Sequence, residues 1–160
     1  RDYKLLDNIE SLRYEFKRTW EELGNKAIKL GDTKSERNFK RYIPYKNILI
    51  VTEDNHSKEL ETLIFWIGDL LKINVKIVSR DSLLNEDITL DMNIFEKIRW
   101  LSGNKEIPRH VFSSGVTVDE RDLMQSGSQE FLCWVKEQSI SITNHRYGNV
   151  GAGPQPFIEW

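Results

Sequence analysis

The sequence predicts an α/β domain with a small, mainly parallel sheet, flanked by helices that include a long one at the N-terminus. Three observations favour this fold class. Apolar residues repeat at helical spacing through the first thirty positions, and residues 47–79 have the pattern strand, helix, strand. The chain of 160 residues is 39% hydrophobic and 30% charged. That balance is typical of a globular domain with a buried core, and we expect one domain over residues 1–160.

The N-terminal segment carries the clearest pattern. Apolar side chains recur every three or four residues from Leu5 to Ala27, with charged residues between them. This is the period of one face of an α-helix, so we expect a long amphipathic helix over residues 1–30. Its stripe could cover a sheet or meet a partner. The candidate partner interface comprises Leu5, Ile9, Leu12, Phe16 and Trp20, together with the terminal Trp160.

Residues 31–46 are polar and basic and show no period, so we expect a loop. Between residues 34 and 46, five cations accompany one acidic residue, and aromatic residues are interleaved with them. Proteins hold single-stranded nucleic acid with cations beside exposed rings. An acidic protein partner and a solvated connector are the alternatives. The candidate binding residues are Lys34, Arg37, Lys40, Arg41, Tyr42 and Lys46.

Residues 47–79 give the strongest supersecondary prediction. An apolar run rich in β-branched residues at 47–51 precedes a segment with a wide apolar helical face, and residues 74–78 then alternate like a strand. This order and length predict a right-handed βαβ unit with two parallel strands.

Carboxylates follow both strands of this predicted unit. Glu53 and Asp54 come after the first strand, and Asp81 comes after the second. Because ligands gather at the carboxyl ends of parallel strands, these side chains could share one rim and hold Mg²⁺ or Mn²⁺. Asp54 could instead turn the chain and cap the following helix.

The segment from Ile48 to Asp54 resembles parts of two known families. Acidic residues follow the first strand of phosphoacceptor receiver domains, and a Thr-x-Asp follows a late strand of PIN-type nucleases, as Thr52, Glu53 and Asp54 do here. The second resemblance implies metal-dependent cleavage of nucleic acid, with Glu53, Asp54 and Asp81 as metal ligands. The chain departs from both families, because the later Asp- and Lys-bearing strands of receivers and the first Asp-bearing strand of PIN domains have no counterpart.

The pattern is weaker after residue 81. We expect a short helix carrying Ile94, Phe95, Ile98 and Leu101, and a strand near residues 111–112. A capping-box pattern at 117–120 predicts another short helix, and residues 128–135 a further one. Residues 139–143 alternate as a strand, and the tail at 144–160 is rich in glycine and proline, which predicts an irregular segment.

Composition and motifs narrow the functional classes. The net charge of −2 gives no global signal for nucleic acid or for acidic membranes, and no apolar run approaches the length of a membrane span. The single cysteine, Cys133, cannot form an internal disulfide, which favours an intracellular protein. There is no phosphate-binding loop, nucleophile elbow or zinc-ligand set, and we expect no cofactor. Because Arg1 opens directly into a helical pattern, we expect a fragment of a longer chain.

These observations favour a non-catalytic interaction or scaffold domain of a larger intracellular assembly, with a protein partner or self-association and no membrane. Nucleic acid is a further candidate partner. The first alternative is a divalent-metal-dependent, nuclease-like enzyme, and the second is a nucleic-acid-binding module built on residues 34–46.

Overall fold

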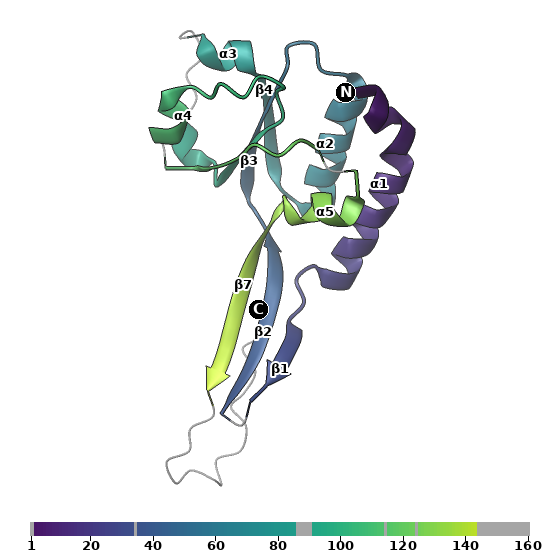
Figure 1. Ribbon diagram of the computed structural model, residues 1–160, viewed down its shortest axis with the longest axis vertical. Helices are drawn as coiled ribbons and strands as arrows, with labels where there is room; N and C mark the ends of the chain where they lie inside the picture. Colours follow the sequence, from purple (N-terminus) through teal and green to yellow (C-terminus); the bar gives the residue numbers. More distant parts are fainter. Residues whose placement is uncertain (1, 34, 86–90, 114, 124, 144–160) are drawn as a thin grey trace.

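The computed structural model describes residues 2–33, 35–85, 91–113, 115–123 and 125–143, with the backbone alone for residues 2–7 and 113. The helices are α1 (Asp2–Leu23), α2 (Lys58–Leu71), α3 (Arg80–Leu84), α4 (Arg109–Ser113) and α5 (Gly127–Leu132), with a 3-10 turn η1 (Met92–Ile94). The strands are β1 (Ile28–Asp32), β2 (Glu36–Pro44), β3 (Asn47–Thr52), β4 (Asn74–Ser79), β5 (Lys97–Trp100), β6 (Thr117–Asp119) and β7 (Val135–Thr143). They form a body around one sheet and an arm that projects from it (Figure 1).

The body is built on a parallel sheet with the strand order β4-β3-β5-β6. The predicted βαβ unit is confirmed, because β3 and β4 run parallel on either side of α2 in the sequence. Ser57 starts α2, and its hydroxyl accepts a hydrogen bond from the backbone N–H of Leu60 at 3.1 Å. The structure therefore confirms the α/β fold class with its mainly parallel sheet and its long N-terminal helix.

Helices cover both faces of this sheet. Ile48 and Ile50 of β3 belong to a core shared with α1, α2 and α5. Leu49 and Val51 point the other way, into a second core that includes Leu83 of α3 and residues of α4 and β5. The apolar run at 47–51 is thus a central strand buried on both faces, as its composition predicts.

The arm is an antiparallel sheet with the strand order β1-β2-β7. Strands β2 and β7 pair over nine residues, from Glu36 opposite Thr143 to Pro44 opposite Val135. The expectation of a basic loop at 31–46 is therefore wrong, because most of that segment is the central strand of the arm. Its partner β7 lies about a hundred residues further along the chain, so the local sequence carries no sign of the pairing.

Three other local predictions are also wrong. Residues 97–100 form strand β5 instead of continuing a helix from Ile94, residues 109–113 form helix α4, and residues 117–119 form strand β6. Helix α1 ends at Leu23, earlier than expected, where Gly24 donates its N–H to the carbonyl of Trp20 and Asn25 adopts a left-handed φ of 53°. Among the described residues, no helix combines the length and apolar character needed to cross a membrane.

Candidate functional site

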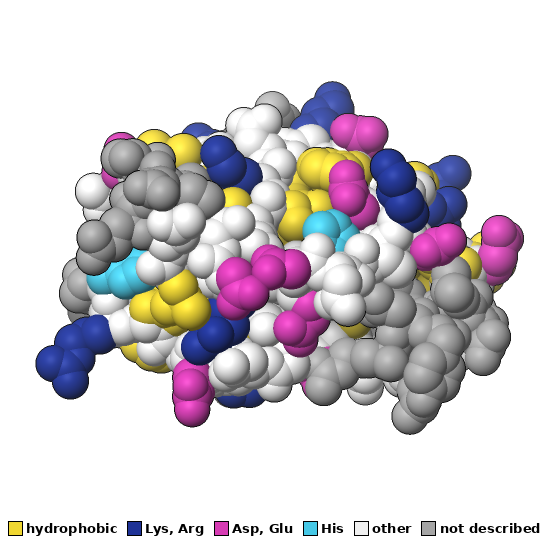
Figure 2. All heavy atoms as spheres, turned by 90° about the horizontal axis from the view of Figure 1, so that it is seen from above, with side chains coloured by type: hydrophobic (Ala, Val, Ile, Leu, Met, Phe, Trp, Pro, Cys, Tyr) yellow, Lys and Arg dark blue, Asp and Glu magenta, His cyan; other side chains and the backbone are white. Residues whose placement is uncertain are grey.

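The carboxyl ends of the parallel strands form the first candidate site. After β3 the chain crosses to β4 on one side of the sheet, and it later returns to β5 on the other side of β3. Parallel sheets bind their ligands at such a point, where the strand order reverses. Acidic side chains gather in the middle of the face seen from above (Figure 2). The predicted site residues Glu53, Asp54 and Asp81 follow the ends of β3 and β4.

The three carboxylates have different partners. Glu53 Oε1 accepts a hydrogen bond from the backbone N–H of Gly103, which follows β5, so Glu53 spans the boundary between β3 and β5. Asp54 is hydrogen-bonded to Ser79 and to Asp81. The bond from Ser79, followed by that from Asp81, lowers the pKa of Asp54, whereas the hydrogen bond and negative charge of Asp54 raise the pKa of Asp81. Asp54 and Asp81 therefore form an exposed carboxyl pair.

The structure brings together part of the predicted metal site. Asp54 and Asp81 meet, and Asp54 does not cap α2, because Ser57 is the capping residue. Glu53 is directed to Gly103 instead. Within the described part of the chain, no group of three or more His, Cys, Asp or Glu side chains is arranged to hold a metal ion. This end of the sheet thus offers a carboxyl pair and a separately bonded glutamate.

A hydrogen-bonded chain that the sequence analysis missed lies next to Glu53. Thr52 Oγ1 is 3.2 Å from His56 Nδ1, and His56 Nε2 is 3.0 Å from Glu61 Oε2. A hydroxyl, an imidazole and a carboxylate bonded in this order resemble a catalytic nucleophile, its general base and the group that orients the base. However, Thr52 is only 1% exposed, so its hydroxyl cannot reach a substrate. These hydrogen bonds instead fix the loop between β3 and α2. In the sequence, the only sign of them is the four-residue spacing of Thr52 and His56.

The predicted basic residues that the structure describes lie on or beside β2, and these described residues do not form a base-stacking surface. Tyr42 is 9% exposed and packs edge-on against Phe131 with 6.3 Å between ring centroids. Lys40 Nζ lies 5.4 Å from the centroid of the Tyr42 ring, and Arg41 Nε donates to Gln138 Oε1 at 2.6 Å. Arg37 is also on β2, Lys46 joins β2 to β3, and Lys34 lies outside the described residues.

The stripe of α1 is occupied by the core of this chain. Leu12 and Phe16 are 1% and 0% exposed, and Phe16 packs edge-on against Phe131 of α5 at 5.6 Å. Ile9 and Trp20 are partly buried against the same core. The structure therefore replaces the predicted partner interface with intramolecular packing at Leu12 and Phe16. The side chain of Leu5 and the whole of Trp160 lie outside the described residues.

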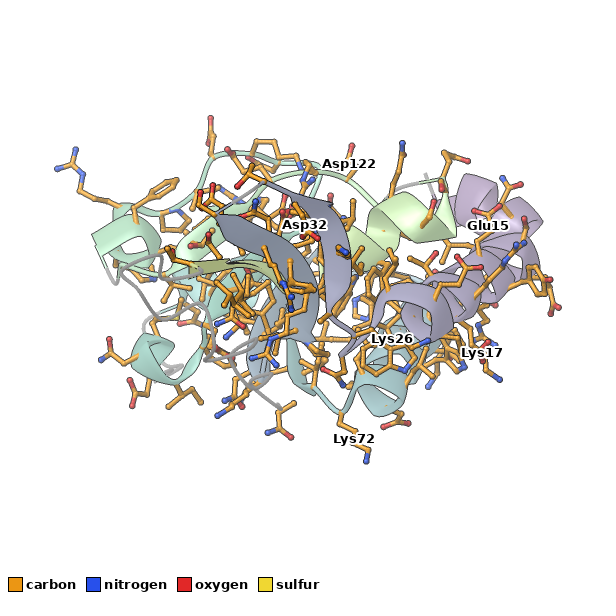
Figure 3. The ribbon with its side chains drawn as sticks, turned by 90° about the horizontal axis from the view of Figure 1, so that it is seen from below. Glu15, Lys17, Lys26, Asp32, Lys72 and Asp122 are labelled. Carbon is orange, nitrogen blue, oxygen red and sulfur yellow. The ribbon has the colours of Figure 1, made fainter. Side chains whose placement is uncertain are left out.

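Glu15 explains how closely α1 and α5 approach. It lies on α1 beside α5 when the molecule is viewed from below (Figure 3), and its Oε2 accepts the backbone N–H of Gly127 at 2.9 Å. A Cβ atom on Gly127 would lie 2.2 Å from the carbonyl oxygen of Leu12. Only glycine allows this contact, so α5 is held tightly against α1 just before the chain enters β7.

The second candidate site is the arm, whose two edges differ. Among the described strands, β7 pairs only with β2, so no described strand pairs with its other edge. Strand β1 has five residues, and its pairing with β2 is irregular between Lys29 and Gly31. It also carries an exposed ion pair between Lys29 and Asp32 at 2.9 Å.

The base of the arm is fixed to the parallel sheet by Lys97, which is 5% exposed. Its Nζ donates to the carbonyl of Cys133 at 2.5 Å and lies 3.3 Å from Asp119 Oδ2. Burial lowers the pKa of Lys97, and the charge of Asp119 opposes that shift. Tyr45 lies in the connection from β2 to β3. The ammonium groups of Lys97 and Lys136 lie 5.2 and 5.5 Å from the centroid of its ring. These contacts set the direction in which the arm projects.

Comparison with known proteins finds similarity to solved structures at the level of fold. No family model and no curated protein matches the chain. It is similar to the structure of Proline Utilization A (PutA) from Corynebacterium freiburgense, with 19% sequence identity and a TM-score of 0.58. The match covers 83% of this chain but only 13% of the PutA chain. The similarity shows that this chain and a region of PutA share a fold.

Proposed function

We propose that this chain is a non-catalytic protein-interaction domain whose arm is the interface. The observation that carries the proposal is the outer edge of β7, along which no described strand pairs. The N–H and C=O groups at such an edge are a template for another strand. A partner that adds a strand there gains backbone hydrogen bonds without any change in the body.

The carboxyl ends of the parallel strands support a role without catalysis. In a ligand-binding sheet the backbone N–H groups after the strands are turned towards the ligand. Here the carboxylate of Glu53 accepts the N–H of Gly103, and His56 is engaged by Thr52 and Glu61. Glu53 and His56 are thus engaged in bonds within the chain.

The similar structure adds a biological setting to the proposal. It belongs to a protein named for proline utilization, in which the matching region is 13% of a longer chain. We propose that the present chain is an accessory domain in a protein of proline utilization. Deleting the domain in its native host should slow growth on proline as the sole nitrogen source and leave growth on ammonium unchanged. Equal growth of both strains on proline would contradict this setting.

A position-specific cross-linking experiment tests the interaction function itself. A photo-reactive residue is placed at Ser141 on β7, or at Leu84 on α3, which is 46% exposed on the body. Irradiation in the native host, followed by mass spectrometry of the adducts, should give a protein adduct from position 141 and none from position 84. No adduct at 141, or equal adducts at both positions, would overturn the proposal.

A further inference from the structure

We infer that the partner of β7 is β7 of a second copy of this chain, paired antiparallel about a two-fold axis at Ser139. The inference rests on the proposed function, because it names the occupant of the same edge. Ser139 is the middle residue of the nine-residue strand, so this register uses the whole of β7.

The contrast between the two edges of the arm indicates which of them is paired. Natural proteins protect free edges with short strands, charges and irregular pairing. Strand β1 has all three, because it is five residues long, is irregular after Lys29 and carries the pair Lys29–Asp32. Strand β7 has no charged residue from Gln138 to Thr143, where the sequence alternates polar residues with isoleucine. This segment has the composition of a strand that is paired on both sides.

The charges of β7 are compatible with self-pairing. Both of its charged residues, Lys136 and Glu137, lie at the end nearest the body. In an antiparallel pair centred on Ser139, Lys136 lies opposite Ile142 of the second copy, and Glu137 lies opposite Ser141. No charged side chain then faces one of its own sign, which is the arrangement that would weaken a strand pair.

The geometry of this pairing also limits the assembly to two copies. The combined sheet has the order β1-β2-β7-β7-β2-β1, so both of its outer edges are the protected strand β1, and a two-fold interface of this kind does not propagate. Each β7 leaves its body at Val135 and spans about 30 Å at roughly 3.3 Å per residue, which puts the two bodies at opposite ends of the sheet. The basic β2 strands are three strand spacings apart, roughly 14 Å. That distance exceeds the screening length of about 8 Å at physiological salt.

Disulfide trapping of the purified chain tests the register. Ser139→Cys puts two thiols directly across the axis, whereas Glu137→Cys puts each thiol opposite Ser141 of the other copy. Both positions are exposed, and the native Cys133 is buried. Mild oxidation should convert S139C to a covalent dimer and leave E137C and the wild type monomeric on a non-reducing gel. Equal trapping of S139C and E137C, or no trapping of either, would overturn the inference.

Light scattering with a matched charge variant tests the edge independently. The mass of the wild type should rise with concentration from 18.9 kDa towards twice that value. Ser139→Lys places two ammonium groups opposite each other, so the midpoint concentration should rise at least about tenfold. Leu30→Lys adds the same charge to β1 and should leave the midpoint concentration unchanged. A strictly monomeric wild type would overturn the second copy as partner, and the cross-link from position 141 to another protein would still support the proposed function. If the cross-link from position 141 is also absent, both the self-pairing of β7 and the proposed interaction function are overturned.

Discussion

Arg99 of β5 and Glu130 of α5 form a two-pronged ion pair that is completely buried. Arg99 Nη1 lies 2.6 Å from Glu130 Oε2, and Nη2 lies 3.0 Å from Oε1, with the two side chains 1% and 0% exposed. Trp134 Nε1 also donates to Glu130 Oε2 at 2.6 Å. Because α5 leads directly into β7, this pair ties the parallel sheet to the base of the arm.

Replacing Glu130 with glutamine should destabilise the domain by about 3–5 kcal/mol, because it leaves the Arg99 guanidinium buried without its counter-charge. The measurement is the free energy of unfolding from urea titration. The matched control is Glu22→Gln, which breaks the pair between Arg18 and Glu22 at exposures of 66% and 58% and should cost at most about 0.5 kcal/mol. Similar losses in the two variants would show that burial does not matter for the Arg99 pair.

Gly127→Ala should separate α5 from α1. The added methyl group would lie 2.2 Å from the Leu12 carbonyl oxygen and 2.5 Å from the Phe16 nitrogen, and backbone atoms cannot give way as a flexible side chain can. We expect a loss of roughly 2–3 kcal/mol in unfolding free energy, which is typical of overpacking. Gln129→Ala, on the exposed side of the same helix, is the control and should change the value by less than about 0.5 kcal/mol. An unchanged G127A variant would contradict the close approach.

Asp119 should make the free energy of unfolding depend on pH in the acidic range. Burial acts to raise its pKa, but the hydrogen bonds from Arg121, together with the charges of Arg99 and Lys97, outweigh burial and hold the pKa well below its usual range. A depressed pKa contributes stability above the unfolded value of about 3.9 and loses it as the pH falls through the folded value. The unfolding free energy of the wild type should therefore exceed that of Asp119→Asn at neutral pH. The difference should begin to narrow below about pH 4, and a constant difference down to pH 2 would contradict this origin.

The pair of Asp54 and Asp81 should respond in the opposite sense. The hydrogen bond and negative charge of Asp54 raise the pKa of Asp81, so its ionised form is penalised in the folded state. Asp81→Asn should therefore raise the melting temperature at neutral pH, and the gain should vanish below the ordinary aspartate pKa of about 3.9. The same melts with added Mg²⁺ or Mn²⁺ test the nuclease-like alternative. A cation bound by the pair would raise the melting temperature of the wild type and not that of D81N, whereas the interaction proposal predicts that the cation changes neither melting temperature.

The elements that the sequence predicts correctly are those whose pattern is local. Strand β3, helix α2 and strand β4 follow one another with the apolar spacing of a βαβ unit. Strand β5 could not be recognised, because its two charged residues are buried. Lys97 and Arg99 look like the solvated side of a helix until Asp119 and Glu130, more than twenty residues away, are brought beside them.

The surfaces that the sequence singled out depend on contacts between distant segments. The apolar stripe of α1 indicated a surface to be covered, and the sequence could not say that α5 and α2 cover it. The basic segment around Arg37 and Arg41 shows its role only when β7 pairs with it. At the ends of the parallel strands, the convergence of Asp54 and Asp81 follows from the βαβ unit, whereas the bond of Glu53 to Gly103 depends on the distant strand β5.

Amide hydrogen exchange along the arm is the sharpest test of strand pairing at β7, because it reports on the backbone groups of each edge. The purified chain is compared at low and high concentration, and the exchange of β7 amides is compared with that of β1. If β7 pairs with a second copy, the exchange of amides on its outer edge, centred on Ser139, should slow as concentration rises, while the exchange of the Ile28–Asp32 amides should not change. Exchange on β7 that is independent of concentration, or protection that rises equally on β1, would contradict pairing at this edge.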